Sequence, residues 1–444
     1  MRRATVRECG GDPVRVLSFS YCFPSGVHPT WGIFVLQRLA ALSKFVDLEV
    51  IAPVPVFPLW SRLCDALPPT RERHSGITVH HPRFFYIPGA FKFLDGRLYA
   101  RGLRDWLDNG VLSAVRPDLL DAHFVWPDGV AVHLLAERLG VPYVITLRGK
   151  IYSCLADRRM RRQVAEALRN AAAVISVSAA MAEAAVALGA APERLHVIPN
   201  GVDRDLFHPR DKHQSRRALG LPLDQRLIVC VAHLQPSKGH EELVGAMARL
   251  SGDVRLVIVG GQAQRGYRRK LASMIDRMGL SSRVLLAGGQ PYQRIPIYLG
   301  AADVSVLASH QEGCPNVVLE SLACGRPVVA TRVGAVPEII RPGRNGKIVP
   351  VRDERALADA IEDVLSRHWP AEKLSRCRAV RSWDTVARKV HRTFRRVLAD
   401  RNKIGGAQRA GAKGSDNAAD HGQSILSRAG AAARPADLLD PSRA

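Results

Sequence analysis

Short apolar segments of strand length alternate with segments of helix length along this chain, and this alternation constrains its fold most strongly. In the first half the predicted strands are 14–18, 48–52, 77–80, 119–122, 144–147, 174–177 and 196–198. In the second half they are 227–231, 255–259, 284–287, 304–307, 328–330 and 347–349. Such alternation is typical of βαβ units with parallel sheets. We therefore expect an α/β fold of two doubly wound, Rossmann-like domains.

Turn-forming residues separate the two series of strands. The segment 199–203, Pro-Asn-Gly-Val-Asp, ends the first series, and the second begins after Phe207. Beyond residue 400 the chain is rich in Ala, Gly, Ser and Arg without apolar periodicity, which is typical of a disordered tail. The predicted parts are a flexible N-terminus (1–13), an N-terminal domain (14–205), a C-terminal domain (206–382), a helix (383–400) and a disordered tail (401–444).

The composition is that of a globular protein. With 444 residues, 47% of them hydrophobic and 24% charged, the chain is long enough for two or three domains with cores of their own. The eight cysteines are scattered without a C-x-x-C pair, which argues against a zinc site and fits a reducing cytoplasm. No apolar stretch follows the N-terminal arginines, so we expect no signal peptide. The Ala-rich segment 171–191 predicts a strand and a helix rather than a membrane span.

The chain is strongly basic, with 64 Lys and Arg against 41 Asp and Glu and a formal net charge of +23. Binding to nucleic acid is one explanation of such a charge. The arginines are spread along the chain, however, and no recognition motif with interleaved aromatic residues accompanies them. We therefore expect no specific nucleic acid partner.

The most informative segment is 310–327, His-Gln-Glu-Gly-Cys-Pro-Asn-Val-Val-Leu-Glu-Ser-Leu-Ala-Cys-Gly-Arg-Pro. Pro315 suits the first position of a helix and Gly325 suits the position just past its end, so a short helix is predicted over 315–324. This helix would begin at the carboxyl end of the predicted strand 304–307, where open α/β sheets bind ligands. The free N–H groups at its start suit a diphosphate.

Two glutamates of this segment are candidate ligands for hydroxyl groups. Glu312 lies just before the predicted helix, and Glu320 lies about a turn and a half inside it. A carboxylate accepts two hydrogen bonds from a vicinal diol such as that of a ribose, so the pair can address hydroxyl groups on either side of a bound phosphate. The alternative is one loop acid and one solvated helix acid. The Gly and Pro of the turn and the sequence Ala-Cys-Gly-Arg-Pro-Val-Val-Ala-Thr that follows favour the first interpretation.

This segment resembles the E-x7-E signature of the family 4 retaining glycosyltransferases of the GT-B fold. The likeness extends through 331–339, Thr-Arg-Val-Gly-Ala-Val-Pro-Glu-Ile, and upstream to 231–240, Val-Ala-His-Leu-Gln-Pro-Ser-Lys-Gly-His, and 198–203, Ile-Pro-Asn-Gly-Val-Asp. It covers about residues 14–400. The resemblance implies two Rossmann-like domains with a cleft between them, of which the N-terminal one binds the acceptor and the C-terminal one the nucleotide sugar.

The resemblance also implies roles for individual residues. Lys238 would neutralise the donor diphosphate, Glu320 would hold the ribose, and Glu312 with the turn that follows it would orient the sugar. Where many members have Gly-Arg, this chain has Ala232-His233, and a neutral His233 is a weaker partner for the leaving group. The implied donor-binding residues are Glu320, Gly313, Cys314, Pro315, Asn316, Val317, His233, Gly239 and Gly32. The implied catalytic residues are Glu312, Lys238, Arg148 and His123, without metal ligands.

Three of these residues lie in the N-terminal half. Gly32 stands in Pro-x-x-Gly-Ile-Phe, which is similar to a variant in transferases resembling those of teichuronic and colanic acid synthesis, and a glycine there lets a phosphate approach the helix start. His123 and Arg148 follow predicted strands, at ends that would face the cleft. Arg148 stands where many relatives have a histidine, and a permanent cation can stabilise a departing phosphate but cannot act as a base. The alternative is a structural role for each.

The resemblance therefore predicts a hexosyltransferase that needs no metal and no cofactor besides its nucleotide-sugar donor. It would transfer the sugar with retention to a glycan or polyprenyl-linked acceptor in cell-surface polysaccharide synthesis. A nucleotide-sugar epimerase or a phosphorylase of the same fold is the alternative.

The basic charge and one apolar segment predict a peripheral membrane contact. The segment 54–60, Val-Pro-Val-Phe-Pro-Leu-Trp, is too apolar for an ordinary solvated loop, and Trp60 suits a headgroup interface. Basic clusters add attraction to an anionic surface. They are formed by Arg158, Arg159, Arg161 and Arg162, and by Arg392, Arg395 and Arg396. We expect a cytoplasmic protein at the inner face of the cytoplasmic membrane, unless the loop packs against its own domain.

Overall fold

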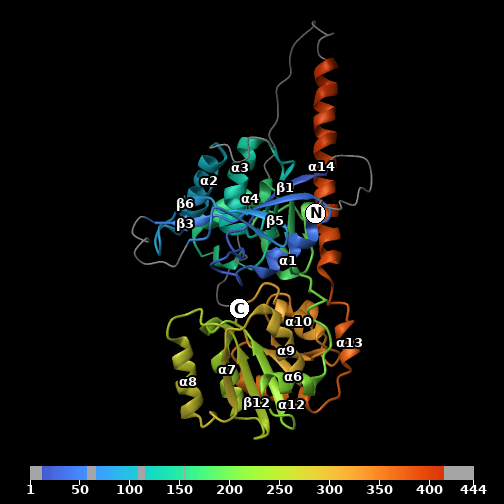
Figure 1. Cartoon of the computed structure of the whole chain (residues 1–444). Helices are drawn as coiled ribbons and strands as arrows, with labels where there is room; N and C mark the ends of the chain where they lie inside the picture. The colour runs from blue at the N-terminus through green and yellow to red at the C-terminus, as the bar shows by residue number, and fades with distance from the viewer. Residues whose placement is uncertain (1–12, 58–66, 109–115, 150, 155, 415–444) are drawn as a thin grey trace, which may run out of the picture. The chain divides into compact units, whose positions relative to one another are not determined.

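The computed structural model describes residues 13–57, 67–108, 116–149, 151–154 and 156–414, and Figure 1 labels their helices and strands. Most of the predicted flexible N-terminus lies outside the described residues. So do Trp60 and the last part of the predicted tail, 415–444.

The first sheet has eight strands among the described residues, in the order β10-β9-β8-β7-β1-β2-β5-β4. Neighbouring strands pair in parallel except for the edge strand β4, which is antiparallel to β5. The strands are β1 (Arg15–Phe19), β2 (Asp47–Ile51), β4 (Arg71–His74), β5 (Ile77–His80), β7 (Leu119–Ala122), β8 (Tyr143–Leu147), β9 (Ala173–Ser176) and β10 (Leu195–Val197).

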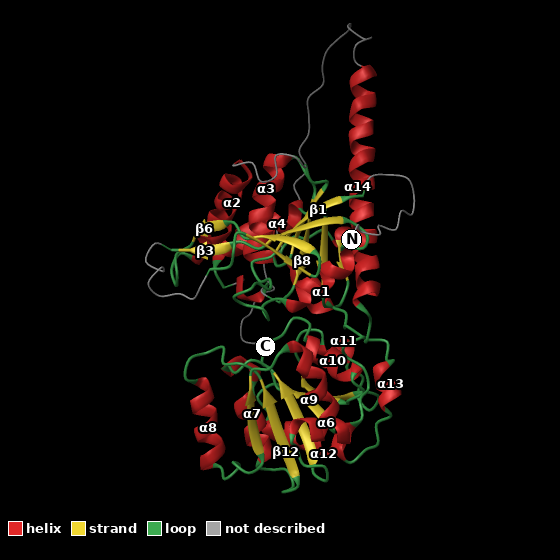
Figure 2. Ribbon diagram, viewed as in Figure 1, coloured by secondary structure: helices red, strands yellow, loops and turns green. Residues whose placement is uncertain are grey.

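Successive residues of each strand point to opposite faces, and buried apolar side chains lie on both of them. Helices cover both faces of this sheet (Figure 2). The helix α1 packs on one face, and α2, α3, α4 and α5 pack on the other. Their bounds are α1 (Ile33–Leu42), α2 (Asp95–Trp106), α3 (Val130–Leu139), α4 (Arg158–Asn170) and α5 (Ala179–Ala187).

The apolar segment predicted as a membrane-contacting loop begins as a strand. Val54–Val56 forms β3, which pairs in parallel with β6 (Arg83–Phe85) in a separate two-stranded sheet. The ring of Phe57 lies 6.1 Å from that of Phe85. The expectation of a loop at 54–56 is therefore wrong, because two β-branched valines flanking a proline suit an edge strand.

The second sheet has six strands among the described residues, in the order β13-β12-β11-β14-β15-β16, all paired in parallel. This is the strand order of a Rossmann fold. The strands are β11 (Arg226–Val231), β12 (Val254–Val259), β13 (Val284–Gly288), β14 (Val304–Leu307), β15 (Val328–Thr331) and β16 (Gly346–Val349). The chain changes sheets between β10 and β11, and the predicted boundary at 205–206 lies in this connection.

The helices of the second half also divide between two faces. The helices α7 (His240–Met247), α8 (Tyr267–Arg277) and α12 (Glu354–Leu365) pack on one face. The other face carries α9 (Ile295–Ala301), α10 (Asn316–Ala323), α11 (Val336–Ile339) and α13 (Ala371–Ser375), and α6 (Lys212–Leu219) lies against α9. The α/β fold with two Rossmann-like domains is thus confirmed. No helix in the described ranges has both the length and the apolar character of a membrane span.

The last helix returns to the first sheet. In α14 (Trp383–Gly414) the residues Trp383, Val386, Val390 and Phe394 recur at helical spacing and are buried in the core that also contains Leu39 of α1. This helix runs past residue 400, where the sequence predicted its end, so 401–414 is helical rather than disordered.

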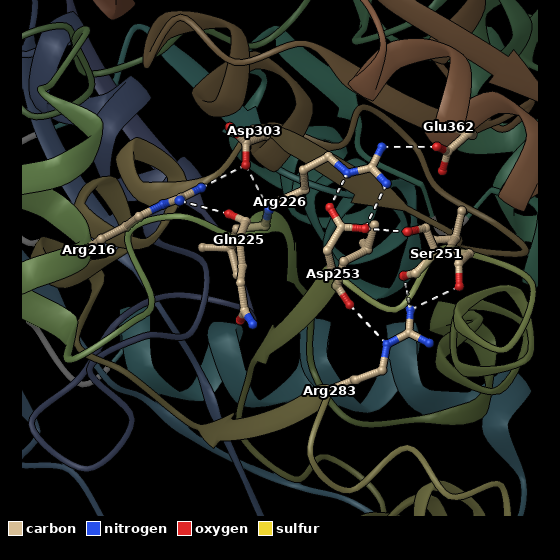
Figure 3. Close-up of polar contacts among 11 residues, drawn as sticks. Arg216, Gln225, Arg226, Ser251, Asp253, Arg283, Asp303 and Glu362 are labelled. Atoms are coloured by element: carbon tan, nitrogen blue, oxygen red, sulfur yellow. Dashed lines mark hydrogen bonds and ion pairs between the residues drawn. The ribbon is translucent and has the colours of Figure 1, made fainter.

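Charged residues form a network of polar contacts at the amino edge of the second sheet (Figure 3). Arg226 donates two hydrogen bonds to the carboxylate of Asp253, at 2.8 and 3.0 Å, and one to Glu362, at 2.9 Å. Asp303 accepts a hydrogen bond from Arg216 at 2.7 Å. These contacts join the starts of β11, β12 and β14 with the last turns of α6 and α12.

Candidate active site

Two loops meet at the carboxyl edge of the second sheet because the strand order places β11 beside β14. One loop ends at Gly239 and the other begins at Ala308. The N–H of His310 donates to the carbonyl oxygen of Ser237 across them, at 2.9 Å. Gly239 has a φ of +65°, and a Cβ at this position would overlap the carbonyl oxygen of Ala308. The two loops therefore fit together only with a glycine at position 239.

The loops bring the predicted residues Lys238 and Glu312 into contact. The Nζ of Lys238 lies 2.6 Å from Oε1 of Glu312, and the same oxygen accepts a hydrogen bond from the hydroxyl of Ser309 at 2.7 Å. The two charged side chains are 20% and 16% exposed, so both are reachable from solvent. Ser309 gave no recognisable signal in the sequence.

The predicted helix over 315–324 is α10, which starts one residue later than predicted because Pro315 is its N-cap. Asn316, its first residue, accepts a hydrogen bond from the amide of Asn200 at 2.8 Å. Val317 is partly buried. Burial raises the pKa of the Cys314 thiol to about 11, so this residue is neutral at pH 7.

Glycines allow close backbone contacts around the turn before α10. A Cβ on Gly313 would lie 3.1 Å from the Cα of Gly149, the residue after Arg148. On the other side, the N–H of Ala335 donates to the carbonyl oxygen of Gly313 at 2.8 Å. The turn is thus held between the segment that follows β8 and the segment that follows β15.

Glu320 is buried within α10 and has an unexpected partner. Its Oε1 accepts a hydrogen bond from the hydroxyl of Tyr292 at 2.8 Å. The Tyr292 hydroxyl accepts one from Gln37 of α1 at 3.0 Å, and Gln37 accepts one from the indole N–H of Trp383 at 3.0 Å. A relay of three hydrogen bonds therefore connects the first turn of α14 and α1 with Glu320. Tyr292 and Gln37 were not predicted, since both stand in sequence without a motif.

Burial raises the pKa of Glu320 to about 7, and the hydrogen bond from Tyr292 opposes this rise only in part. A carboxyl group with a raised pKa binds its proton more tightly in the folded state than in the unfolded state. Its contribution to stability is therefore fully present below pH 4.5 and is lost as the pH rises through about 7. The shift corresponds to about 3 kcal/mol.

We expect Glu320→Gln to remove this pH dependence, since the amide does not titrate. The measurement is urea unfolding at about pH 5 and about pH 8, at which Glu320 is mostly protonated and mostly ionised. The wild-type protein should lose more free energy of unfolding between the two pH values than Glu320→Gln does. Equal losses in both proteins would contradict the raised pKa.

The surroundings of Gly32 and His233 bear on the roles predicted for these two residues. Gly32 has a φ of +65°, and a Cβ there would overlap the carbonyl oxygen of Cys22. The glycine is thus required by the chain's own backbone, whether or not a ligand binds at the helix start.

His233 is exposed after β11, and desolvation together with the Lys238 ammonium lowers its pKa. Its ring is therefore neutral at pH 7.

Arg148 follows β8 in the first sheet, and only some of the hydrogen-bond donors of its guanidinium have partners among the described residues. Its Nη1 donates to the side-chain oxygen of Asn200 at 3.1 Å, and its guanidinium lies 5.2 Å from the centre of the Phe34 ring. Nε and Nη2 are buried without a hydrogen-bond partner among the described residues. Such orphaned donors favour an anionic ligand at this position.

His123 has no exposed surface. Its Nε2 lies 3.0 Å from the carboxylate of Asp121, which also accepts a hydrogen bond from Ser18. Burial lowers the pKa of His123 although Asp121 opposes the shift, so the ring is neutral at pH 7. His123 and Gly32 therefore contact other parts of the N-terminal domain, whereas Lys238, Glu312 and the turn before α10 come together. Within the described ranges, no three His, Cys, Asp or Glu side chains gather as a candidate metal site.

Comparisons with known proteins agree with this arrangement. Residues 211–379 match the family described as "Glycosyl transferases group 1", and residues 54–206 match "Glycosyltransferase Family 4". The chain is 31% identical over 363 residues to the putative teichuronic acid biosynthesis glycosyltransferase TuaC of Bacillus subtilis, covering 78% of this chain and 88% of that protein. It is 34% identical over 308 residues to D-inositol 3-phosphate glycosyltransferase of Acidothermus cellulolyticus, covering 64% and 68%.

Solved structures share the fold. Sucrose-phosphate synthase from Thermosynechococcus elongatus superposes with a TM-score of 0.72 at 24% identity, covering 87% of this chain and all of that one. The Anabaena protein HepE, solved in complex with UDP and glucose, superposes with a TM-score of 0.66 at 22% identity over 86% and 99% of the two chains. The two family matches, the similarity to TuaC and the shared GT-B fold lead to one conclusion: the chain belongs to the family 4 glycosyltransferases and is a glycosyltransferase.

Proposed function

We propose that this enzyme transfers a sugar from a nucleotide-diphosphate sugar to a glycan or polyprenyl-linked acceptor, with retention of configuration and without a metal. One observation carries the proposal. Lys238 contacts Glu312 four residues before the start of α10, while Glu320 lies buried within that helix. A cation, a helix start and two carboxylates at such spacing suit a diphosphate flanked by a ribose and a sugar.

Positive charge on both sides supports stabilisation of the leaving group. As the bond between the anomeric carbon and the diphosphate oxygen breaks, negative charge grows on the diphosphate. Lys238 and the N–H groups at the start of α10 would stabilise this charge from one side. The donors of Arg148 that have no partner among the described residues would stabilise it from the other side. Because these cations belong to the protein, the step requires no divalent ion.

Retention follows from the face on which the acceptor is expected to attack. The acceptor hydroxyl would attack the anomeric carbon from the face that the diphosphate leaves, and its proton would pass to the departing phosphate oxygen. The new glycosidic bond thus replaces the old one on the same face. Arg148 cannot serve as a base, and the buried His123 has no exposed surface with which to meet an acceptor.

The similarity to a putative teichuronic acid biosynthesis enzyme supports an acceptor in cell-surface polysaccharide synthesis. A lipid-linked acceptor would require contact with the inner face of the cytoplasmic membrane. Exposed arginines support such a contact, since each contributes about 1 kcal/mol beside an anionic surface. They are Arg158 on α4 and Arg392, Arg395 and Arg396 on α14.

The proposed reaction is tested by identifying the donor and then the product. Nucleotide sugars that bind should raise the melting temperature of the full chain. With the donor identified, we expect NMR of the product to show the donor's anomeric configuration and the rate to be unchanged in EDTA. Turnover without an acceptor would indicate the alternative epimerase activity, and turnover with inorganic phosphate a phosphorylase. An inverted product, or activity that EDTA abolishes and Mg²⁺ or Mn²⁺ restores, would contradict the proposal.

A further inference from the structure

A groove with a volume of about 410 Å³ lies between α4 and the segment that leads into α2. We call it the arginine groove. It is lined by Phe93, Arg97, Arg159, Arg162, Gln163 and Glu166. Its volume falls within the range of sites that hold small molecules. None of these six residues belongs to the candidate donor site described above.

Contacts between the two walls fix the shape of the groove. The guanidinium of Arg159 lies over the ring of Phe93, 4.5 Å from its centre. The amide of Gln163 donates to the carbonyl oxygen of Phe93 at 2.9 Å. The turn that contains Phe93 is therefore fastened to α4, and Arg159 is held by a cation–π contact rather than left to move freely.

The groove is positively charged, and its arginines have free hydrogen-bonding capacity. Three arginines and one glutamate line it, which leaves a net charge of 3 − 1 = +2. In the described part of the chain, no carboxylate forms an ion pair with Arg97, Arg159 or Arg162. Their side chains are exposed. A guanidinium presents a planar fork of donors that matches phosphate oxygens, so the groove suits an anionic phosphate group.

The position of the groove is that of an acceptor site rather than a remote surface. The helix α4 follows β8 and Arg148, so its first turn lies at the carboxyl edge of the first sheet. The start of α2 lies at the same edge, because a Cβ on Gly96 would be 2.8 Å from Val130, the first residue of α3. The groove is thus built on the domain that is proposed to bind the acceptor, at the edge that carries Arg148.

We propose that the arginine groove binds the diphosphate of a polyprenyl-linked acceptor. This inference rests on the proposed function and specifies its acceptor. A net charge of +2 matches the two phosphates of such a linkage better than it matches a single sugar carboxylate. Holding the diphosphate there would orient the attached sugar without contact to the reacting atoms, so the groove residues are positioning residues.

The test measures binding of inorganic pyrophosphate by equilibrium dialysis. All proteins carry Lys238→Gln, which removes the main cation of the donor site and leaves the groove intact. The groove variant adds Arg97→Gln, Arg159→Gln and Arg162→Gln. The control adds Arg217→Gln, Arg249→Gln and Arg277→Gln, which remove the same charge from exposed positions at or after the ends of α6, α7 and α8. Circular dichroism establishes that each variant is folded.

We expect the groove variant to bind pyrophosphate at least about tenfold more weakly than the control. Because pyrophosphate binding needs no sugar transfer, this result does not depend on whether the proposed transferase reaction is correct. Equal affinities in the two variants would overturn the proposal. Glucuronate that binds the groove as tightly as pyrophosphate would overturn it as well, since the site would then be one for sugar carboxylates.

A vesicle measurement distinguishes the acceptor from a membrane headgroup as the source of the phosphate. The same variants are sedimented with vesicles of phosphatidylcholine, alone or mixed with phosphatidylglycerol. We expect groove and control variants to bind the anionic vesicles equally, through the other basic residues. A loss of vesicle binding confined to the groove variant, with pyrophosphate binding unchanged, would assign the groove to lipid headgroups and overturn the proposal. Absence of binding to anionic vesicles in every protein would contradict only the membrane contact.

Discussion

Replacing Lys238 by Met should lower kcat/KM about 10²-fold to 10³-fold. Lys238 stands on the loop after β11 and lies 2.6 Å from Glu312, which precedes α10 by four residues. Loss of one preorganised group that stabilises developing negative charge typically has an effect of this size. The measurement is steady-state turnover with the donor that raises the melting temperature most.

The matched control for this change is Lys270→Met. Lys270 lies on α8 and forms an ion pair at 2.7 Å with Glu241 of α7 rather than with Glu312, and its side chain is 62% exposed. We expect its kcat/KM to equal that of the wild-type enzyme, so loss of a positive charge alone cannot explain the effect at Lys238. Wild-type kcat/KM in Lys238→Met would refute the role assigned to this lysine.

Replacing Gly239 by Ala should destabilise the protein by about 2–4 kcal/mol and also reduce activity. Gly239 follows Lys238, has a φ of +65°, and leaves no space for a Cβ beside the carbonyl oxygen of Ala308. The loop after β11 would have to move away from the loop after β14. Since Lys238 and Glu312 stand on these two loops, their contact would be disturbed.

Gly220 provides a control with the same backbone conformation. It too has a φ of +65°, at the end of α6, but nothing lies within 4 Å of an added Cβ. Gly220→Ala therefore carries only the conformational cost, about 1–2 kcal/mol. Urea unfolding should show a larger loss of stability for Gly239→Ala, and activity should fall in that variant alone. Equal losses in both variants would show that the contact with Ala308 is not restrictive.

The sequence was sufficient to predict the parts of the site that local chemistry determines. Pro315 and Gly325 delimit α10 through their backbone preferences, and the apolar runs of β11 and β14 define the strands whose ends carry Lys238 and Glu312. Once the strand order is that of a Rossmann fold, these two ends must lie side by side. A motif and a topology together therefore bring Lys238 and Glu312 to the same edge of the sheet, although their ion pair itself was not predicted.

Contacts between side chains distant in sequence could not be predicted in this way. Tyr292 and Glu320 are connected only after the loop following β13 packs against α10, and Gln37 reaches Tyr292 from α1. The burial of His123 depends on the helices that cover the first sheet, and not on its position after β7. In each case the deciding quantity is tertiary packing, which residue spacing does not encode.

The return of α14 to the first sheet has a consequence for synthesis on the ribosome. The segment from Trp383 to Val397 completes the core that Leu39 and Val50 begin, although more than half of the chain separates them. Domains generally fold as units in the order in which they emerge. Here the domain that emerges first cannot close its apolar face until the last helix has been translated. That face must stay exposed, or be shielded by a chaperone, while the whole C-terminal domain is being made.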